Sequence, residues 1–293
     1  FDSVHGQWDK DVSIKDDSLV VDGQPVGYSQ NEAIADTHWQ KANVDLILDC
    51  TGAFKSPEAL QPYFDQAVTK VVVSAPIKGF PRDQVLNVVV GVNDHEYVGQ
   101  DIVTAASCTT NCLAPVVKVL HEHVGIERGA ITTIHNVTNT QVVVDAPHKD
   151  LRRARSALNS LIPTSTGSAT AITMIYPELT GKLNGNAVRV PLLNASLTDA
   201  VFTMQRDVTV DEINELFRAA ANGELAGILG FEDLPLVSAD YTNDTRSGIV
   251  DGPSTMVIDG RMVKVLVWYD NEYGYAFRMA DLAAKVAALL SAG

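Results

Sequence analysis

Cys108 is the residue of this chain best placed to do covalent chemistry. It follows the β-branched run 101–106, which predicts a strand, and precedes the run 113–124, which is apolar at helical spacing. We therefore predict that a strand delivers Cys108 to the start of a helix. The free N–H groups and positive dipole end there stabilise a thiolate, so such a cysteine can act as a nucleophile near neutral pH.

A buried structural cysteine is the alternative interpretation of Cys108. The polar, cap-type neighbours Ser107 and 109–111 favour the functional one, because such residues are unusual in an ordinary core. Cys112, one helical turn further on, and Cys50, at the end of an apolar strand, are interpreted as structural. No second cysteine or histidine pair lies near enough to complete a zinc site, so we predict no metal site.

His135 is the best candidate for the base that a nucleophilic thiol needs. It ends the β-rich run 130–134, and an imidazole held at a strand end can take a thiol proton and later move protons at a reacting carbonyl. His121 and His123 lie roughly 20 Å further along the predicted helix from Cys108 at 1.5 Å per residue. We therefore pair His135 with the thiol.

A second group of residues suits an anion. The segment 164–168 carries hydroxyls and a glycine before an alanine-containing helical run, so it can form a phosphate-binding helix start. Arg189 lies in an apolar strand and needs an anionic partner, either a substrate phosphate or a structural carboxylate. Thr138 and Thr140 extend the group, as does the basic stretch 148–155, whose alternative is a solvated helix face. Together they favour a substrate that carries phosphate.

The elements that must position these residues predict an α/β fold of two parts. The valine-rich runs 44–48, 71–73 and 85–90 are typical of a parallel sheet buried on both faces. Such sheets bind ligands at the carboxyl ends of their strands. From residue 128 onward, longer β-rich segments separated by helices predict a mixed or antiparallel sheet, and a helix from about residue 275 to 290 ends the chain.

Composition narrows the class of protein. The chain has 293 residues, 46% of them hydrophobic, and a net charge of −14 from 22 basic and 36 acidic residues, which argues against nucleic-acid and acidic-membrane partners. Three cysteines do not form a disulfide framework, and we expect a cytoplasmic protein. No Gly-x-Gly-x-x-Gly turn is present, so either the parallel sheet binds no dinucleotide or the chain begins after that unit.

The ordered motifs of the whole chain resemble phosphorylating glyceraldehyde-3-phosphate dehydrogenase. The resemblance rests on the segments 107–115, 133–135, 152–155 leading to 163–167, 189–191 and 268–275. Any one of these would be suggestive only, whereas all of them in order make chance agreement implausible.

The resemblance implies a Rossmann-type parallel domain at 1–107, completed by the C-terminal helix 272–293, and an α+β catalytic domain at 108–271 with a mixed or antiparallel sheet. It also implies that the first βαβ unit, on the order of fifty residues with the Gly-rich turn, precedes Phe1. A homotetramer with a place in glycolysis is expected by the same resemblance.

The resemblance further implies a reaction. Cys108 would add to the aldehyde carbon of glyceraldehyde 3-phosphate with His135 as general base, NAD would take the hydride, and inorganic phosphate would cleave the thioester to give 1,3-bisphosphoglycerate. The substrate phosphate would lie near Thr138 and Arg189. The attacking phosphate would lie near Ser107, Thr109, Arg153, Thr166 and Gly167, and the cofactor near Thr51, Gly52, Ser74, Asn271 and Tyr275.

Several alternatives remain open at this point. Features of Ala146-Pro147 leave NADP possible beside NAD, and the segment 135–141 also resembles a branch of the family that accepts arsenate in place of phosphate. Thr140 departs from the acidic residue that many members carry there. The rival functions are an erythrose-4-phosphate dehydrogenase, a cofactor-independent thiol hydrolase using Cys108 and His135, and a non-catalytic truncated fragment.

Overall fold

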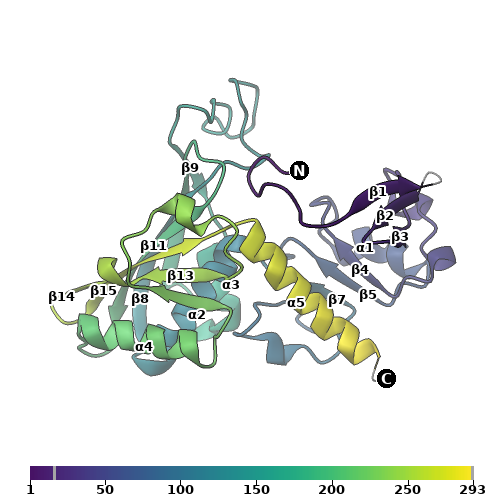
Figure 1. The fold of residues 1–293 in the computed structure, drawn as a ribbon. Coiled ribbons are helices and arrows are strands. Elements are labelled where there is room, and N and C mark those ends of the chain that lie inside the picture. The colour runs from purple at the N-terminus through teal and green to yellow at the C-terminus, as the bar shows by residue number, and fades with distance from the viewer. Residues whose placement is uncertain (16–17, 292–293) are drawn as a thin grey trace.

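Two larger sheets, a small third sheet and a long C-terminal helix organise the computed structural model, which describes residues 1–15 and 18–291 (Figure 1). Residues 292–293 of the predicted C-terminal segment lie outside the described residues. The expected α/β fold is confirmed, whereas the domain limits at 107/108 and 271/272 stay a prediction. No helix of the described residues is long and apolar enough to cross a membrane.

The first sheet has four strands, all parallel, in the order β4-β5-β7-β6. Its strands are β4 (Leu46–Asp49), β5 (Lys70–Val73), β6 (Val85–Asn87) and β7 (Ile102–Thr104). Helix α1 (Pro57–Phe64) connects β4 to β5 and begins at a serine cap, Ser56, whose Oγ accepts from Ala59 N. The valine-rich runs therefore form the parallel sheet that the sequence predicts.

A small antiparallel sheet near the N-terminus was not predicted. It consists of β1 (Val12–Lys15), β2 (Ser18–Val21) and β3 (Gln24–Val26), in that order. These strands are short and largely exposed, so the burial pattern that reveals a strand in sequence is weak here.

The second sheet has eight strands and is mixed, as expected. The order is β12-β13-β15-β11-β8-β10-β9, and β14 pairs with β15. The pairs β10–β8 and β12–β13 are parallel, and the others are antiparallel. The strands are β8 (Ile126–His135), β9 (Ile162–Ser165), β10 (Leu183–Arg189), β11 (Ser196–Met204), β12 (Leu229–Glu232), β13 (Gly248–Asp251), β14 (Met256–Ile258) and β15 (Met262–Tyr269).

Helices α2 (Cys108–His123), α3 (Ser168–Ile175) and α4 (Val210–Asn222) belong to the same core as this sheet. Leu113, Val117 and Leu120 of α2 are buried in one apolar cluster with Phe202 of β11 and Val265 of β15. Burial of such side chains stabilises by roughly 1.5–3 kcal/mol each, so α2 is fixed in place by its packing.

Helix α5 (Tyr273–Leu290), yellow in Figure 1, packs on the parallel sheet. Its residues Met279, Leu282 and Val286 share a buried cluster with Val72 of β5 and Val103 of β7. The end of the chain therefore returns to the first sheet after the second one is complete.

The chain between β8 and β9, residues 136–161, forms an extended loop in teal at the top of Figure 1. The basic stretch 148–155 lies in this loop as turns and bends, so the alternative of a solvated helix face is wrong. Short 3-10 helices complete the elements: η1 (Ile34–Asp36), η2 (Gln40–Ala42), η3 (Asp94–Glu96), η4 (Pro177–Leu179), η5 (Ser238–Tyr241) and η6 (Gly252–Ser254).

Candidate active site

The junction between β7 and α2 presents Cys108 as the first residue of the helix. Ser107 is the N-cap, and its Oγ accepts from Thr110 N at 3.2 Å. Ala106 has φ +53°, a left-handed conformation that a non-glycine residue adopts only when its surroundings impose it. The tight turn that this produces leaves Cys108 at a cavity rather than within the core. The predicted strand-to-helix delivery is confirmed.

Cys108 and His135 meet, although they lie on different elements. The Sγ of Cys108 is 3.5 Å from Nε2 of His135, the last residue of β8. His121 and His123 lie at the other end of α2, where His121 Nε2 is 2.9 Å from Glu178 Oε1. His135 is therefore the imidazole within reach of the thiol among the described residues.

The protonation states of this pair differ from the expectation. Burial raises the pKa of the Cys108 thiol more than the Thr109 N–H and the charge of Arg189 lower it, so the predicted thiolate near neutral pH is wrong for the free protein. Burial and, next, Arg189 lower the pKa of His135 to about 4. The pair is consequently a neutral thiol beside a neutral imidazole, in which a base is available but the proton has not moved.

The second ring nitrogen of His135 contacts both a donor and an acceptor. Nδ1 lies 2.9 Å from Asn136 O and 2.6 Å from Arg189 Nη1, and the same Nη1 donates to Asn136 O at 3.1 Å. If Nδ1 carries the proton, it donates to Asn136 O and Nε2 can accept from the thiol. If Arg189 donates to Nδ1, the proton sits on Nε2 instead. General-base action requires the first arrangement.

The cavity beside the pair is about 270 Å³ in volume and carries polar groups from three directions. It is lined by Pro76, Lys78, Ser107, Cys108, Thr109, Thr110, Thr133, His135, Ser165, Thr166, Gly167, Ser168, Ala171, Ala187 and Arg189. No aspartate or glutamate belongs to this lining, although the chain has 36 acidic residues. Hydroxyls, N–H groups and two cations without carboxylates suit an oxyanion.

The structure brings most of the predicted anion ligands together, but not all. Ser107, Thr109, Thr166, Gly167 and Arg189 line the cavity with the catalytic pair. Thr138 and Arg153 do not belong to this lining. Thr138 lines a neighbouring cavity of the 136–161 loop, and Arg153 Nη1 donates to Thr140 Oγ1 at 3.2 Å. Arg153 also lies 3.5 Å from Asp150, so the basic loop satisfies its own charge there.

The predicted cofactor residues lie along the carboxyl ends of the parallel strands and at the start of α5. Thr51 and Gly52 follow β4, and Ser74 follows the neighbouring strand β5. Tyr275 donates from Oη to Ala106 O at 3.3 Å, directly beside Cys108. The first three therefore lie at one edge of the first sheet, and Tyr275 lies at the turn that leads to the thiol.

The hydrogen bonds of Asn271 indicate whether the region between the first sheet and α5 fits NAD. Its Oδ1 accepts from Ser196 Oγ at 2.9 Å, and its Nδ2 makes no hydrogen bond with any other described residue. Because Asn271 is buried, an amide held by its oxygen with a free NH₂ is a donor for a carboxamide oxygen. The donor set at this edge thus fits the nicotinamide end of the cofactor. The residues that the structure describes contain no group of acidic, histidine or cysteine side chains able to hold a metal.

Tyr269 is a positioning residue that the sequence analysis missed. Its Oη lies 2.9 Å from Thr109 Oγ1 on α2 and 2.7 Å from Thr133 Oγ1 on β8, and its ring packs edge-on against His135. One phenol therefore connects the helix that carries the thiol to the strand that carries the imidazole. The only sequence signal was its place in the segment 268–275, which gives no distance.

Replacing Tyr269 by Phe removes both hydrogen bonds and leaves two threonine hydroxyls facing an apolar ring edge. We expect the free energy of unfolding to fall by roughly 1–3 kcal/mol in urea denaturation, because buried unpaired hydroxyls are costly. Tyr241→Phe is the matched control, since the Tyr241 hydroxyl is buried without a partner among the described residues. Equal stability of the two variants would contradict the bridging role.

Stability should also depend on pH through His135. The unfolded imidazole titrates near 6.5, and the folded one near 4, so only the unfolded chain gains this proton as the pH falls between these values. Stability is therefore constant above this window and falls within it, by about 1.4 kcal/mol per pH unit for this group. His135→Gln should show a shallower loss between pH 6.5 and 4.5 in urea titrations, whereas parallel curves would contradict the buried neutral state.

Comparison with known proteins places this geometry in a family. Residues 107–271 match the glyceraldehyde 3-phosphate dehydrogenase C-terminal domain, and residues 1–57 match the NAD binding domain of the same family. The chain is 58% identical over 290 residues to glyceraldehyde-3-phosphate dehydrogenase 3 of Nostoc sp., a match that covers 98% of this chain and 85% of the relative. It is 47% identical over 289 residues to glyceraldehyde-3-phosphate dehydrogenase of Geobacillus stearothermophilus, with the same coverage. It is 48% identical over 286 residues to glyceraldehyde-3-phosphate dehydrogenase 1 of Bacillus cereus, over 97% of this chain and 84% of the relative. This chain belongs to the glyceraldehyde-3-phosphate dehydrogenase family.

Proposed function

We propose that this protein oxidises glyceraldehyde 3-phosphate with NAD and phosphorylates the product to 1,3-bisphosphoglycerate. The observation that carries the proposal is the 3.5 Å approach of Cys108 Sγ to His135 Nε2 in a cavity lined by hydroxyls and cations without carboxylates. Covalent catalysis and oxyanion binding are both required by this reaction, and one cavity offers both.

The first step forms a bond between Cys108 Sγ and the aldehyde carbon. The thiol proton passes to His135 Nε2, and the carbonyl oxygen becomes an oxyanion. The N–H groups of Cys108 and Thr109 stabilise that charge, because neither has a partner within the helix and the Thr110 N–H is taken by the Ser107 cap. Proton transfer from the thiol to the imidazole accompanies bond formation in this proposal, because Nε2 lies 3.5 Å from Sγ.

NAD, when bound, supplies the acceptor for the hydride that leaves this carbon. Asn271 holds the carboxamide of the nicotinamide through its free Nδ2, and Tyr275 packs beside the ring from its anchor on Ala106 O. Thr51, Gly52 and Ser74 line the rest of the cofactor path along the strand ends. NADP is the alternative that these residues do not favour.

The substrate phosphate lies between Arg189 and Thr138 in this proposal. Binding of a phosphate by Arg189 withdraws its N–H from His135 Nδ1, which then donates to Asn136 O. Nε2 is thereby left as an acceptor for the thiol proton. Arg153 Nη1 donates to Thr140 Oγ1, which lies 3.0 Å from Thr138 Oγ1, and this contact supports a role for Arg153 on the substrate-phosphate side.

The second half-reaction cleaves the Cys108 thioester with an inorganic oxyanion held by Ser107, Thr109, Thr166 and Gly167. Thr166 and Gly167 precede α3, whose first N–H groups face an anion favourably. Phosphate is the acceptor that we propose. Arsenate has nearly the same shape and charge, so it can replace phosphate at these groups.

The rival functions receive no support from the site. Hydrolysis by a thiol involves no nicotinamide, so it does not explain the Asn271 amide and the Tyr275 ring beside the nucleophile. An erythrose-4-phosphate dehydrogenase needs no inorganic phosphate at the α3 start. A non-catalytic fragment would not require a buried His135 within reach of a half-buried thiol.

We also propose a homotetramer located in the cytoplasm. Helices α2, α3 and α4 share one core with the large sheet, whereas the other face of its central strands is half-exposed. On that face Ile134, Leu197 and Leu266 form a short apolar strip across β8, β11 and β15, next to the ion pair of Asp199 and Lys264. A second copy of the chain is the partner that this strip supports. Three unpaired cysteines support a reducing compartment and therefore the cytoplasm.

The assembly is tested by placing a charge in the middle of the apolar strip. Leu197→Glu, between Ile134 and Trp268, should lower the mass measured by light scattering during gel filtration, because an unpaired carboxylate would be buried at the contact. Ala219→Glu on the exposed side of α4 is the control and should leave the mass unchanged. An unaltered mass for both variants would contradict assembly through this face.

The reaction is tested by Cys108→Ser. We expect NADH formation from glyceraldehyde 3-phosphate to fall by at least roughly a thousandfold, because a serine hydroxyl is a far weaker nucleophile and leaving group. Wild-type protein without phosphate should instead release a burst of NADH equal to its sites and then stop. Cys50→Ser, at an exposed thiol, is the control. NADH formation that survives Cys108→Ser would overturn the proposed function.

A further inference from the structure

Lys78 occupies the space that a side chain at residue 167 would need. A β-carbon on Gly167 would lie 2.6 Å from Lys78 Nζ, closer than two such atoms can approach. Gly167 has φ −93°, which any residue can adopt, so its backbone does not require glycine. The absent side chain leaves room for the ammonium group over the start of α3.

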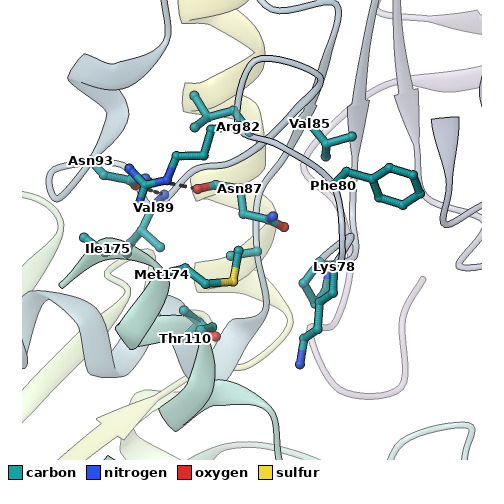
Figure 2. Close-up of a pocket in the computed structure, with 14 residues that line it drawn as sticks. Lys78, Phe80, Arg82, Val85, Asn87, Val89, Asn93, Thr110, Met174 and Ile175 are labelled. Atoms are coloured by element: carbon teal, nitrogen blue, oxygen red, sulfur yellow. Dashed lines mark hydrogen bonds between the residues drawn. The ribbon is translucent and has the colours of Figure 1, made fainter. Parts of the chain in front are cut away.

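No residue that the structure describes neutralises this ammonium. The side chain of Lys78 is exposed and makes no salt bridge or hydrogen bond with any of them, although it lines the cavity of Cys108 together with Thr166 and Gly167. Figure 2 shows its side chain extending away from Phe80 and Arg82, with Nζ free at the end. By contrast, Arg82 is paired with Glu96 at 2.8 Å.

Arg153, the cation expected beside Thr166 and Gly167, does not line this cavity. Arg153 contacts Thr140 and Asp150 in the 136–161 loop, and Arg189 contacts His135 and Asn136. Lys78 is therefore the cation beside Thr166 and Gly167 among the described lining residues. Its loop follows β5 and belongs to the first sheet, so both halves of the molecule contribute to this end of the cavity.

We propose that Lys78 binds the inorganic oxyanion that cleaves the Cys108 thioester. This inference rests on the function proposed above and adds a binding residue to its second half-reaction. After the hydride has left, His135 releases the thiol proton to solvent and is neutral again. An oxygen of hydrogen phosphate then forms the new bond to the carbonyl carbon, the carbon–sulfur bond breaks, and the phosphate proton passes through His135 to the leaving sulfur. The ammonium of Lys78 contacts the spectator oxygens of the dianion and holds it against the α3 start.

The proposal separates the two half-reactions experimentally. The variant Lys78→Met is made in the full-length protein. It keeps an unbranched side chain and removes the positive charge. The NADH burst without phosphate should keep its amplitude, and the KM values for NAD and glyceraldehyde 3-phosphate should stay unchanged. Breakdown of the acyl-enzyme should need roughly tenfold more phosphate to reach half its maximal rate, the usual worth of one charge-assisted hydrogen bond.

Two further variants distinguish ligand binding from general damage. Lys78→Arg should restore most of the phosphate affinity, because it returns the positive charge. Lys41→Met removes a lysine from the exposed 3-10 helix η2 and should change none of these constants. Inorganic arsenate should show the same shift as phosphate in Lys78→Met, since its charge and shape are the same.

Gly167→Ala provides a double-mutant cycle. Its β-carbon displaces the flexible end of Lys78, so the variant should fold and should itself weaken phosphate use. In the Lys78→Met background the alanine should cost much less, because the displaced group is already gone. Additive effects would show that Gly167 and Lys78 act separately and would overturn the proposal.

The remaining outcomes are also decisive. A raised KM for NAD with unchanged phosphate use would assign Lys78 to the cofactor, and a raised KM for glyceraldehyde 3-phosphate would assign it to the substrate phosphate. Either result would overturn the inference. Failure of the wild-type protein to give any NADH burst would instead refute the proposed function, independently of Lys78.

Discussion

The site depends on one contact between two elements, the first turn of α2 and the last residue of β8. Neither Cys108 nor His135 is reactive through its own element alone, because partial burial raises the pKa of the Cys108 thiol. What makes chemistry possible is that Nε2 lies 3.5 Å from Sγ, so the proton can move as the carbon–sulfur bond forms. The packing of α2 against the large sheet and the Tyr269 hydroxyl that contacts both elements maintain that distance.

The charged side chains that line the site are positive, whereas the chain as a whole is negative. The protein carries a net charge of −14, yet the cavity of Cys108 has lysine and arginine in its lining and no carboxylate. A local positive field in an acidic protein attracts an oxyanion to one place and leaves the rest of the surface unattractive to it. The same positive charge keeps the His135 imidazole neutral. Burial lowers its pKa most, and Arg189 lowers it further. Anion binding and a neutral base thus come from one arrangement.

The sequence predicted those features that a single segment determines. The β7–α2 junction, the end of β8 at His135 and the start of α3 after Gly167 each leave a local pattern of apolar spacing and capping residues. The parallel sheet was evident for the same reason. The β1–β3 sheet was missed because its strands are exposed and short.

What the sequence did not reveal depends on tertiary contact. The family resemblance implied Arg153 at the attacking phosphate, and in the structure the loop pairs it with its own Asp150 and Thr140. Nothing in the sequence indicated a role for Lys78, since a single lysine in a loop after a strand is common. The thiol pKa was predicted from the helix start alone, and burial, which no local pattern reports, outweighs it.

The segment between β15 and α5 unites the two halves of the molecule at the thiol. Asp270 is buried there, and its Oδ1 accepts from the N–H groups of Glu272 and Tyr273 at the start of α5. The next residue, Asn271, is held by Ser196 of the large sheet, while α5 packs on the parallel sheet. A shift of α5 would therefore move the Asn271 amide and the Tyr275 ring together with the strand ends that carry the cofactor residues. Cofactor position and thiol position are coupled because one short turn, held by Asp270 and Ser196, belongs to both.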